Sequence, residues 1–502
     1  MKASEIVDQI IEIEAAAPVE QWTIDGIHVW PLIRIQLGTD LFKTHQSTRS
    51  DLSGASHVWR RGAACLRGWG AFSAASWLDR REGHADIGKA QALFLTSGVA
   101  FTALQGKYYE RFCDPIRSYL DSRNISSLML TPLDRFLVPR FSPSRFIQPQ
   151  LDWIQIKHTI FRNNRRPVEC LPGFESVFER LRQVAPAVVP KLDRVRHHVS
   201  LVVEFSRYFE RLLEQVRPRI CFLVAYYWLV GYGLLLACKR NGIPTIDLQH
   251  GTQGAMHRAY GNWTKVPAQG YELLPTHFWC WTDDEVAVIQ RWAESTGGAH
   301  RPVVGGNLFL NLCKSNSLSS VRECDDLVRK KVGALGADKQ ILVTLQWGLL
   351  TDEFTRTLSR AIESTVDRYQ WWLRLHPSML QERKKVRKLF GHFPNVDVDM
   401  ATDLPLYALL QHMTVHVTHS SSTVLEAYEF GIRSVVCSRY GQELFLNQEK
   451  EGVLIYAGTH EDLLMAIDKQ RNLRGAMEQI TAQGSEQVKM SYSVLDRLVG
   501  VV

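Results

Sequence analysis

"RICFLVAYYWLVGYGLLLACKRNGIPTIDLQHG", residues 219–251, is the stretch of the chain that decides its fold. A short apolar run at 220–224 predicts a buried strand, the run at about 228–239 predicts a helix, and the run at 243–248 predicts a second strand. Strand, helix and strand joined by short turns are typical of a parallel sheet. Two glycines interrupt the apolar run, which favours this interpretation over a membrane span.

Similar apolar runs precede and follow this unit in the first half of the chain. We expect strands at 92–97, 126–131, 153–156, 277–282 and 302–307. The pattern before them is helical. The sequence therefore predicts a helical N-terminal region over 1–85 and a first Rossmann-like domain over 86–312.

The alternation of strands and helices restarts after a polar segment, 313–338, which we interpret as a linker. Strands are expected at 341–346, 371–376, 396–399, 415–420 and 434–438. They predict a second Rossmann-like domain over 339–475, followed by a C-terminal helix over 476–502. The predicted fold is thus α/β, with two doubly wound domains and a helical N-terminal extension. Ligands of open parallel sheets bind beyond the carboxyl ends of the strands.

A run of hydroxyl side chains follows the predicted strand at 415–420. It comprises Ser420, Ser421, Ser422 and Thr423. Thr423 and Glu426 have the spacing of a capping box, which would start a helix in this loop. The N–H groups of a helix N-terminus bind phosphate well. Plain capping needs only one hydroxyl, so four in succession favour a phosphate site.

"RLHP", residues 374–377, ends another strand at the same edge. Pro377 stops the ladder, His376 can donate to a phosphate oxygen, and Arg374 shares its strand face. A histidine that serves only the turn is the alternative. We assign these residues to donor binding because they share an edge with the serines.

"QHGT", residues 249–252, ends a strand of the first domain. His250 suits a general base facing a cleft, and Gly251 allows a ligand to approach the backbone closely. Gln249 and Thr252 are expected beside it. Local packing of His250 is the alternative, but motifs on both sides of a cleft favour a site for two substrates.

These three motifs, in this order, resemble those of GT-B glycosyltransferases that build bacterial surface polysaccharides. The set is most similar to CDP-glycerol glycerophosphotransferases and to the HP and SS motifs of sialyl- and polysialyltransferases. "WTIDGIHVWPLIRIQL" (22–37) resembles the start of capsule and O-antigen transferases. The convincing likeness covers roughly residues 220–450.

The resemblance implies roles for individual residues. His250 would take the proton of the acceptor hydroxyl, His376 and the serines would hold the donor phosphate, and Glu426 would bind the ribose. It implies a metal-independent transferase without a cofactor. The chain lacks the acidic D/E-D/E-G motif of sialyltransferases, since "WTDDEV" (281–286) reads better as a helix cap. The donor therefore stays open between a CMP-sugar, which we favour, a CDP-alcohol and another nucleotide sugar.

The loop after the strand at 92–97 offers candidates for acceptor binding. They are Ser97, Lys107, Tyr108 and Tyr109. Aromatic rings stack on sugars and lysine meets lipid phosphate, although the tyrosines fit a core equally well.

Composition bounds the location and the partners. Nine scattered cysteines without a CxxC pair predict neither zinc nor a disulfide framework, and the N-terminus has no pattern of a secretory signal. We expect a cytoplasmic protein. Tryptophans interleave with arginines in 59–83, which predicts contact with a membrane surface or, alternatively, a helix that packs its aromatic side chains. A net charge of +7 is modest for nucleic-acid binding.

The sequence thus predicts a glycosyltransferase that moves a sugar from a nucleotide-activated donor to a lipid-linked or growing surface glycan. Three alternatives remain: a CDP-alcohol phosphotransferase of the same fold, a sugar-nucleotide 2-epimerase, and a non-catalytic protein of polysaccharide assembly. The epimerase would need acid/base carboxylates in the cleft, and the sequence shows no such pair.

Overall fold

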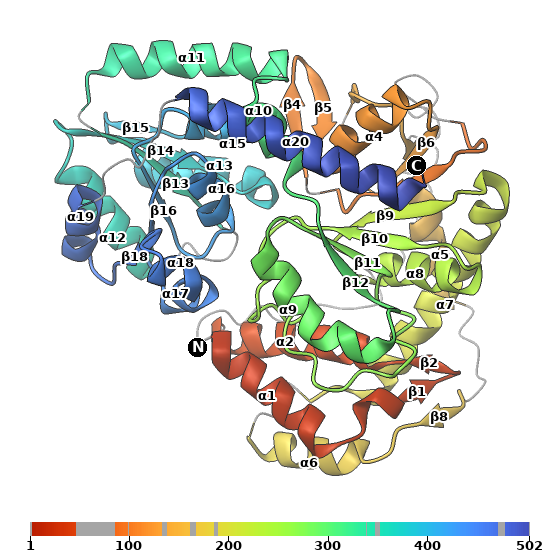
Figure 1. Cartoon of the computed structure of the whole chain (residues 1–502). Coiled ribbons are helices and arrows are strands. Elements are labelled where there is room, and N and C mark those ends of the chain that lie inside the picture. Colours follow the sequence, from red (N-terminus) through yellow and green to blue (C-terminus); the bar gives the residue numbers. More distant parts are fainter. Residues whose placement is uncertain are drawn as a thin grey trace.

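The computed structural model describes residues 3–46, 86–98, 100–132, 138–160, 167–184, 189–337, 339–346, 352–469 and 477–500. The described chain forms two parallel sheets covered by helices (Figure 1). Two doubly wound α/β domains are therefore confirmed. Residues 59–83, the predicted membrane contact, lie outside the described residues.

The first sheet has seven parallel strands in the order β12-β11-β10-β9-β3-β6-β7. Their bounds are β3 (Ala92–Leu95), β6 (Ser127–Thr131), β7 (Arg145–Phe146), β9 (Ile220–Val224), β10 (Thr245–Leu248), β11 (His277–Cys280) and β12 (Arg301–Val304). The chain begins this sheet in the middle, runs outward to β7 and returns to β9. The order of the strands therefore reverses between β3 and β9, where open sheets bind ligands.

Helix α8 (Leu229–Arg240) joins β9 to β10, as the opening stretch predicts. It packs on the long helix α7 (Leu192–Val216). A Cβ at Gly233 would lie 2.5 Å from Cβ of Phe205, so this glycine lets α8 approach α7 closely. The glycine that interrupts the apolar run thus serves helix packing. No helix in the described ranges has the length and apolarity of a membrane span.

The second sheet has six parallel strands in the order β15-β14-β13-β16-β17-β18. Their bounds are β13 (Lys339–Thr344), β14 (Tyr369–Arg374), β15 (Val396–Asp397), β16 (Val415–Thr418), β17 (Ser434–Val436) and β18 (Leu454–Tyr456). Helices α12 (Asp352–Glu363), α13 (Arg383–Phe390), α14 (Asp399–Asp403), α15 (Leu406–Leu410), α16 (Thr423–Glu429), α17 (Arg439–Leu444), α18 (Leu446–Lys450) and α19 (His460–Lys469) join or follow them. The order reverses between β13 and β16.

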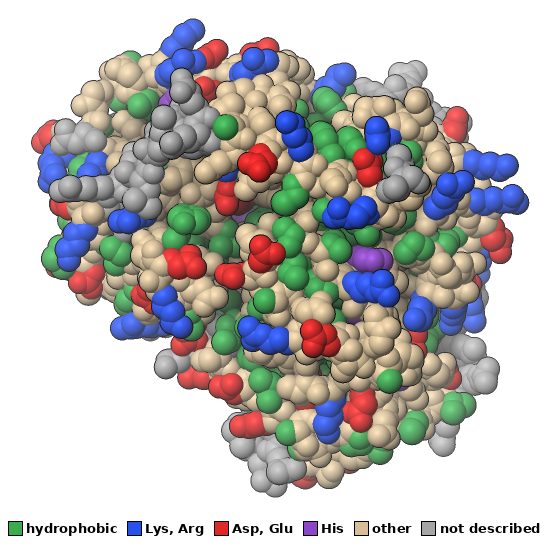
Figure 2. Space-filling model, in the orientation of Figure 1, with side chains coloured by type: hydrophobic (Ala, Val, Ile, Leu, Met, Phe, Trp, Pro, Cys, Tyr) green, Lys and Arg blue, Asp and Glu red, His purple; other side chains and the backbone are tan. Residues whose placement is uncertain are grey.

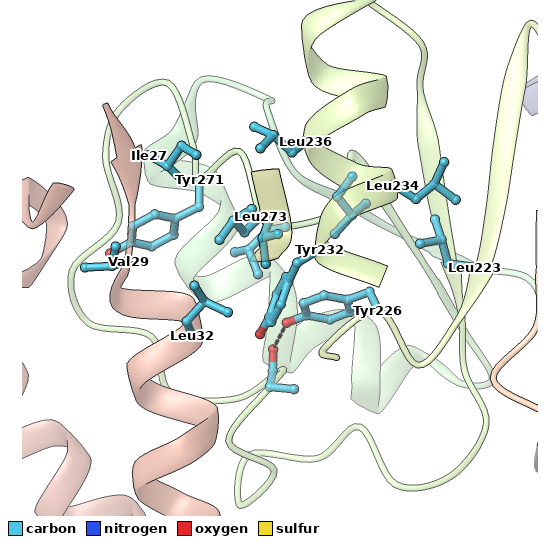
Figure 3. Packing of buried hydrophobic residues seen from close by; sticks show 14 of the residues in the cluster. Ile27, Val29, Leu32, Leu223, Tyr226, Tyr232, Leu234, Leu236, Tyr271 and Leu273 are labelled. Atoms are coloured by element: carbon cyan, nitrogen blue, oxygen red, sulfur yellow. Dashed lines mark hydrogen bonds between the residues drawn. The ribbon is translucent and has the colours of Figure 1, made fainter. Parts of the chain in front are cut away.

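The N-terminal region is only partly helical. Between α1 (Ala3–Ala16) and α2 (Trp30–Gln46), strands β1 (Thr23–Ile24) and β2 (Ile27–His28) form a hairpin that pairs with β8 (Glu169–Cys170). The expectation of helix throughout was wrong here, because Asp25 and Gly26 have φ of 50° and 77° and form a tight turn. Figure 3 shows Ile27, Val29 and Leu32 packed among residues of the first domain.

Two other expectations need correction. The strand predicted at 153–156 is part of α5 (Gln148–Ile160), since four alternating residues are too few to separate the helical and strand periods. The polar segment 313–338 contains α11 (Ser319–Leu335), which follows α10 (Leu308–Lys314). Among the described residues, the first half also contains α4 (Cys113–Ser122), α6 (Phe174–Val184) and α9 (Asp283–Ala293).

Helix α20 (Met477–Val499) crosses from the second half of the chain back to the first sheet (Figure 1). It packs along α10, and its Tyr492 stacks on Tyr119 of α4 with ring centroids 3.8 Å apart. On the other side of the molecule, the backbone N–H of Ser4 donates to Glu443 of α17 over 3.1 Å. Contacts at two distant places thus tie the domains together.

Candidate active-site cleft

A cavity of about 190 Å³ lies between the carboxyl edges of the two sheets. Both domains contribute to its walls. The first domain provides Ala100, Phe101, Thr102, Arg111, Phe112 and His250; α10 provides Phe309; the second domain provides Thr344, Leu345, Arg374, Leu375, His376, Pro377, Leu406, Tyr407, Ser421, Ser422, Thr423 and Glu426. The structure therefore brings together motifs that lie far apart in the sequence.

Arg374 ends β14 and is fixed before any ligand binds. Its Nη1 donates to the carbonyl oxygens of Ala401 and Leu404 over 2.7 and 2.5 Å. Burial lowers the pKa of its guanidinium to about 10. Arg374 is therefore a positioned cation at neutral pH.

His376 and Pro377 follow Arg374 and line the same cavity. Burial lowers the pKa of His376, and the nearby cations Arg111 and Arg374 lower it further. The imidazole is consequently neutral near pH 7. Its position matches the sequence-based prediction, in which the HP pair shares an edge with the serines.

The residues of the serine loop, Ser420–Thr423, have two different positions. Ser421, Ser422 and Thr423 line the cavity, whereas the backbone N–H and the hydroxyl of Ser420 donate to Oε1 of Gln346 over 2.8 and 3.2 Å. Gln346 lies two residues beyond the end of β13. Ser420 thus ties the loop to the neighbouring strand end, and the three residues after it form the wall.

The capping box predicted for Thr423 and Glu426 was wrong. Ser422 occupies the N-cap position of α16 without a side-chain cap, and Glu426 accepts a hydrogen bond from the hydroxyl of Tyr407. Burial raises the pKa of Glu426, while Arg111 and the Tyr407 hydrogen bond oppose this effect. A capping box does occur at Thr282 and Glu285, which confirms the helix cap predicted in 281–286.

His250 follows β10 and forms part of the opposite wall. Its Nε2 lies 3.1 Å from the hydroxyl of Tyr227. Burial lowers the pKa of His250 to about 4, so the ring is neutral at pH 7. A Cβ added to Gly251 would lie 3.6 Å from Oγ of Ser422. The loops of the two domains therefore meet here.

The neighbours of His250 hold its loop in place. Gln249 is buried, and its Nε2 donates to the carbonyl oxygen of Gly251 over 2.8 Å. Its Oε1 accepts from the backbone N–H of Trp281 over 2.5 Å. The cavity lining does not include Gln249, Gly251 or Thr252. The bond between Gln249 and Gly251 therefore stabilises the conformation of the loop.

The predicted acceptor residues lie away from the cavity lining. Strands β4 (Phe101–Leu104) and β5 (Lys107–Glu110) form a hairpin, with Lys107 exposed next to its turn. Tyr109 is buried, and its ring centroid lies 5.3 Å from that of Phe309. The core interpretation of Tyr109 therefore replaces acceptor binding. Ser97 and the half-buried Tyr108 are also outside the lining.

Arg111 is a cavity residue that the sequence analysis missed. It follows β5 directly, and its Nε donates to the carbonyl oxygen of Ala100 over 3.2 Å. Its charge lowers the pKa of His376, Arg374 and Glu426 across the cleft. The sequence signal for this hairpin was the pair Gln105-Gly106. These residues have φ of 49° and 73° and form the kind of two-residue turn that joins hairpin strands.

Buried carboxylates hold the segment around Arg111. Glu110 accepts from the hydroxyl of Thr96 over 3.0 Å and from the backbone N–H of Phe112 over 2.9 Å. Asp114 accepts from the backbone N–H of Glu110 over 2.8 Å. These bonds link the hairpin to the carboxyl end of β3, and they fix the direction in which Arg111 leaves the backbone.

The chemistry of the walls follows from these charges. Arg111 and Arg374 are cations, and Glu426 is the cavity's carboxylate among the described residues. Hydroxyl groups and neutral imidazoles complete the polar lining. Such a site suits an anion whose oxygens accept several hydrogen bonds, such as phosphate. Elsewhere in the described ranges, no three His, Cys, Asp or Glu side chains converge as metal ligands.

Comparison with known proteins gives likenesses of fold at low identity. No family model and no curated protein matches the chain. Three similar solved structures are a UDP-GlcNAc 2-epimerase from Methanocaldococcus jannaschii (12% identity, 80% of this chain and 98% of that chain, TM-score 0.49), a UDP-GlcNAc 2-epimerase from Neisseria meningitidis bound to UDP-GlcNAc (12%, 80% and 93%, 0.43), and a ugt transferase from Siraitia grosvenorii in complex with UDP (13%, 82% and 99%, 0.44). Because these scores lie below 0.5, the likenesses assign neither an activity nor a ligand.

Proposed function

We propose that the protein is a GT-B glycosyltransferase that moves a sugar from a nucleotide-activated donor to a hydroxyl of a lipid-linked or growing surface glycan. One observation carries this proposal. Two arginines and the three hydroxyl residues of the serine loop line the same small cavity as the neutral His250 of the first domain. An anionic donor and a proton acceptor for a second substrate can thus meet in one place.

The donor phosphate binds to groups from both domains. Arg374 is anchored by two carbonyl oxygens, and Arg111 reaches the same cavity from the hairpin. The hydroxyls of Ser421 and Ser422 and the ring of His376 add hydrogen bonds. The hydroxyl of Tyr407 donates to Oε1 of Glu426. The other carboxylate oxygen, Oε2, accepts a hydrogen bond from a ribose hydroxyl.

The transfer step uses His250 as the base. The acceptor hydroxyl takes the hydrogen-bonding position at Nε2 that the Tyr227 hydroxyl now holds. Its oxygen attacks the anomeric carbon, its proton passes to His250, and the bond from that carbon to the donor phosphate oxygen breaks. The negative charge left on the nucleotide is stabilised by Arg111 and Arg374, because preorganised cations act where charge develops.

The epimerase alternative fits the cavity less well. Acid/base chemistry at a sugar carbon requires a pair of suitable groups, and Glu426, the cavity's carboxylate in the described chain, already bonds Tyr407. A CDP-alcohol phosphotransferase would use the same phosphate groups. The two transferase reactions differ in the donor and can be separated by experiment.

A thermal-shift panel with CMP, CDP, UDP, GDP and dTDP tests the proposal. A ligand at 100 times its Kd stabilises a protein by about 2.7 kcal/mol, so the true nucleotide gives a clear rise in Tm. A response to cytidine nucleotides supports the CMP-sugar or CDP-alcohol donor. A response to UDP alone moves the donor to UDP-sugars and requires an epimerisation assay. No response to any nucleotide contradicts the enzyme and favours a non-catalytic role.

A further inference from the structure

A second and larger cavity, of about 720 Å³, lies between α5 and α7 of the first domain. In Figure 1 these helices lie on the right, away from the second sheet at the upper left. The hydroxyl of Ser200 on α7 lies 2.8 Å from Nε2 of His158 on α5, so the helices are joined directly. The proposed reaction does not use this face.

Large apolar side chains project from this face into solvent. Val168, Ile160 and Trp153 are 69%, 60% and 54% exposed, and they are the three most exposed large apolar side chains of the described residues. Trp153 lines the cavity, as does Pro167, the neighbour of Val168. Trp153, Lys157 and Ile160 are spaced i, i+4 and i+7 on α5, so they share one helix face.

Besides the residues of its ion pairs, this cavity is lined by two further cations and by one further carboxylate, Asp25. Arg196 bonds to Glu169 over 2.9 Å and to Asp193 over 2.8 Å. Arg207 pairs with Glu204 in the same way. Lys157 and Arg211, which also line the cavity, form no ion pair with any described residue. Figure 2 shows basic side chains along this right-hand edge of the molecule.

We propose that the face formed by α5 and α7 binds the surface of an anionic lipid bilayer. Tryptophan and isoleucine beside lysine are typical of helices that lie in the plane of a membrane interface. A protein partner is the weaker fit because lysine is depleted from protein interfaces. The cavity between the helices accepts lipid headgroups, whose phosphates meet Lys157 and Arg211. This inference stands independently of the reaction in the cleft.

Co-sedimentation of the full chain with vesicles tests the proposal. Vesicles of phosphatidylcholine are compared with vesicles that also contain phosphatidylglycerol. We expect binding to the second kind only, and we expect added salt to weaken it. The double variant Trp153→Ser/Ile160→Ser abolishes binding, and Lys157→Glu/Arg211→Glu lowers the partition coefficient by at least about fivefold for each cation removed.

The matched control is Leu327→Ser/Lys330→Glu on α11 of the linker region. Leu327 is 52% exposed, so the control makes the same chemical change on a different face. It keeps wild-type binding if the proposal is right. The proposal is overturned if the wild type ignores phosphatidylglycerol, or if the control and the α5 variants lose binding equally. Retained binding by both α5–α7 variants overturns it as well and transfers the contact to another surface, such as residues 59–83.

Discussion

The carboxyl edges of the two sheets face one cleft, but they are built differently. In the second domain, the segments that follow β14 and β16 contribute His376, Pro377 and Ser421–Thr423 to the wall. In the first domain, His250 is the cavity residue that follows a main-sheet strand directly, and Arg111 comes from the β4–β5 hairpin. The second sheet thus lines the cavity with loops at its own strand ends, whereas the first sheet relies on the added β4–β5 hairpin.

This hairpin belongs to both domains. Leu104 and Tyr109 pack in a cluster with Phe309 and Tyr407, and Gln105 donates to Glu323 of α11 over 3.2 Å. Arg111 belongs to the first domain, but its hairpin packs against the second domain. In the proposed function, His250 carries the chemistry, and Arg111 binds the donor together with the second domain.

The largest effect should separate these roles. His250→Ala removes the base, and we expect kcat to fall by about 10²–10⁴-fold, the usual contribution of general base catalysis. The Kd of the donor nucleotide should stay within about twofold, because His250 takes part after donor binding. Steady-state kinetics and calorimetry measure the two quantities. Thr252→Ala, in the same loop but outside the cavity, is the control, and an active His250→Ala variant refutes the assignment.

Arg111→Ala should affect binding next most strongly. Hydrogen bonds to charged groups contribute about 1.5–3 kcal/mol, so we expect a nucleoside diphosphate to bind roughly 10–100-fold more weakly. Binding of the nucleoside should not change, since it has no phosphate. Lys107→Ala, on the same hairpin but outside the cavity, should bind as the wild type does. Equal losses for nucleoside and nucleotide would exclude a phosphate contact.

Glu426→Gln should give a smaller and complementary loss. The amide keeps the shape and the contact with Tyr407 but accepts more weakly from a ribose hydroxyl, so we expect about a tenfold rise in Kd. Nucleoside and nucleotide should weaken together, in contrast to Arg111→Ala. An unchanged Kd with a lowered Tm would show instead that Glu426 only supports the Tyr407 contact.

The smallest effect is expected from pH. A base must be unprotonated, so its activity falls as pH drops below its pKa. With an ordinary histidine pKa near 6.5, kcat/KM would fall roughly eightfold between about pH 7 and 5.5. Burial lowers the pKa of His250 to about 4, so kcat/KM should change little over this interval. A loss centred near the ordinary histidine pKa would show that His250 is solvated or is not the base.

The sequence predicted the sheets well for a physical reason. Strands buried on both faces read as continuous apolar runs, and β9 spans the predicted residues 220–224. Motifs at the ends of such strands are predicted equally well, as Arg374 and His376 show. His250, Ser421 and Glu426, all predicted from the sequence, line one cavity.

The missed features depend on contacts distant in sequence. Arg111 reaches the cleft because its hairpin packs on another domain, which local pattern cannot show. Glu426 has capping-box spacing, but Tyr407 lies close enough to take its carboxylate. The helix at 153–156 leaves Trp153 exposed, so its pattern lacked the usual buried stripe.

The path of α20 has a consequence for synthesis. Val494 and Leu495 are buried in one cluster with Phe94 of β3 and Phe222 of β9. These partners are separated by several hundred residues, so this cluster of the first sheet stays incomplete until α20 is translated. Domains tend to fold as they emerge, yet this one completes its core only after the second domain has been translated. A nascent chain stalled before α20 should therefore present Phe94 and Phe222 to chaperones.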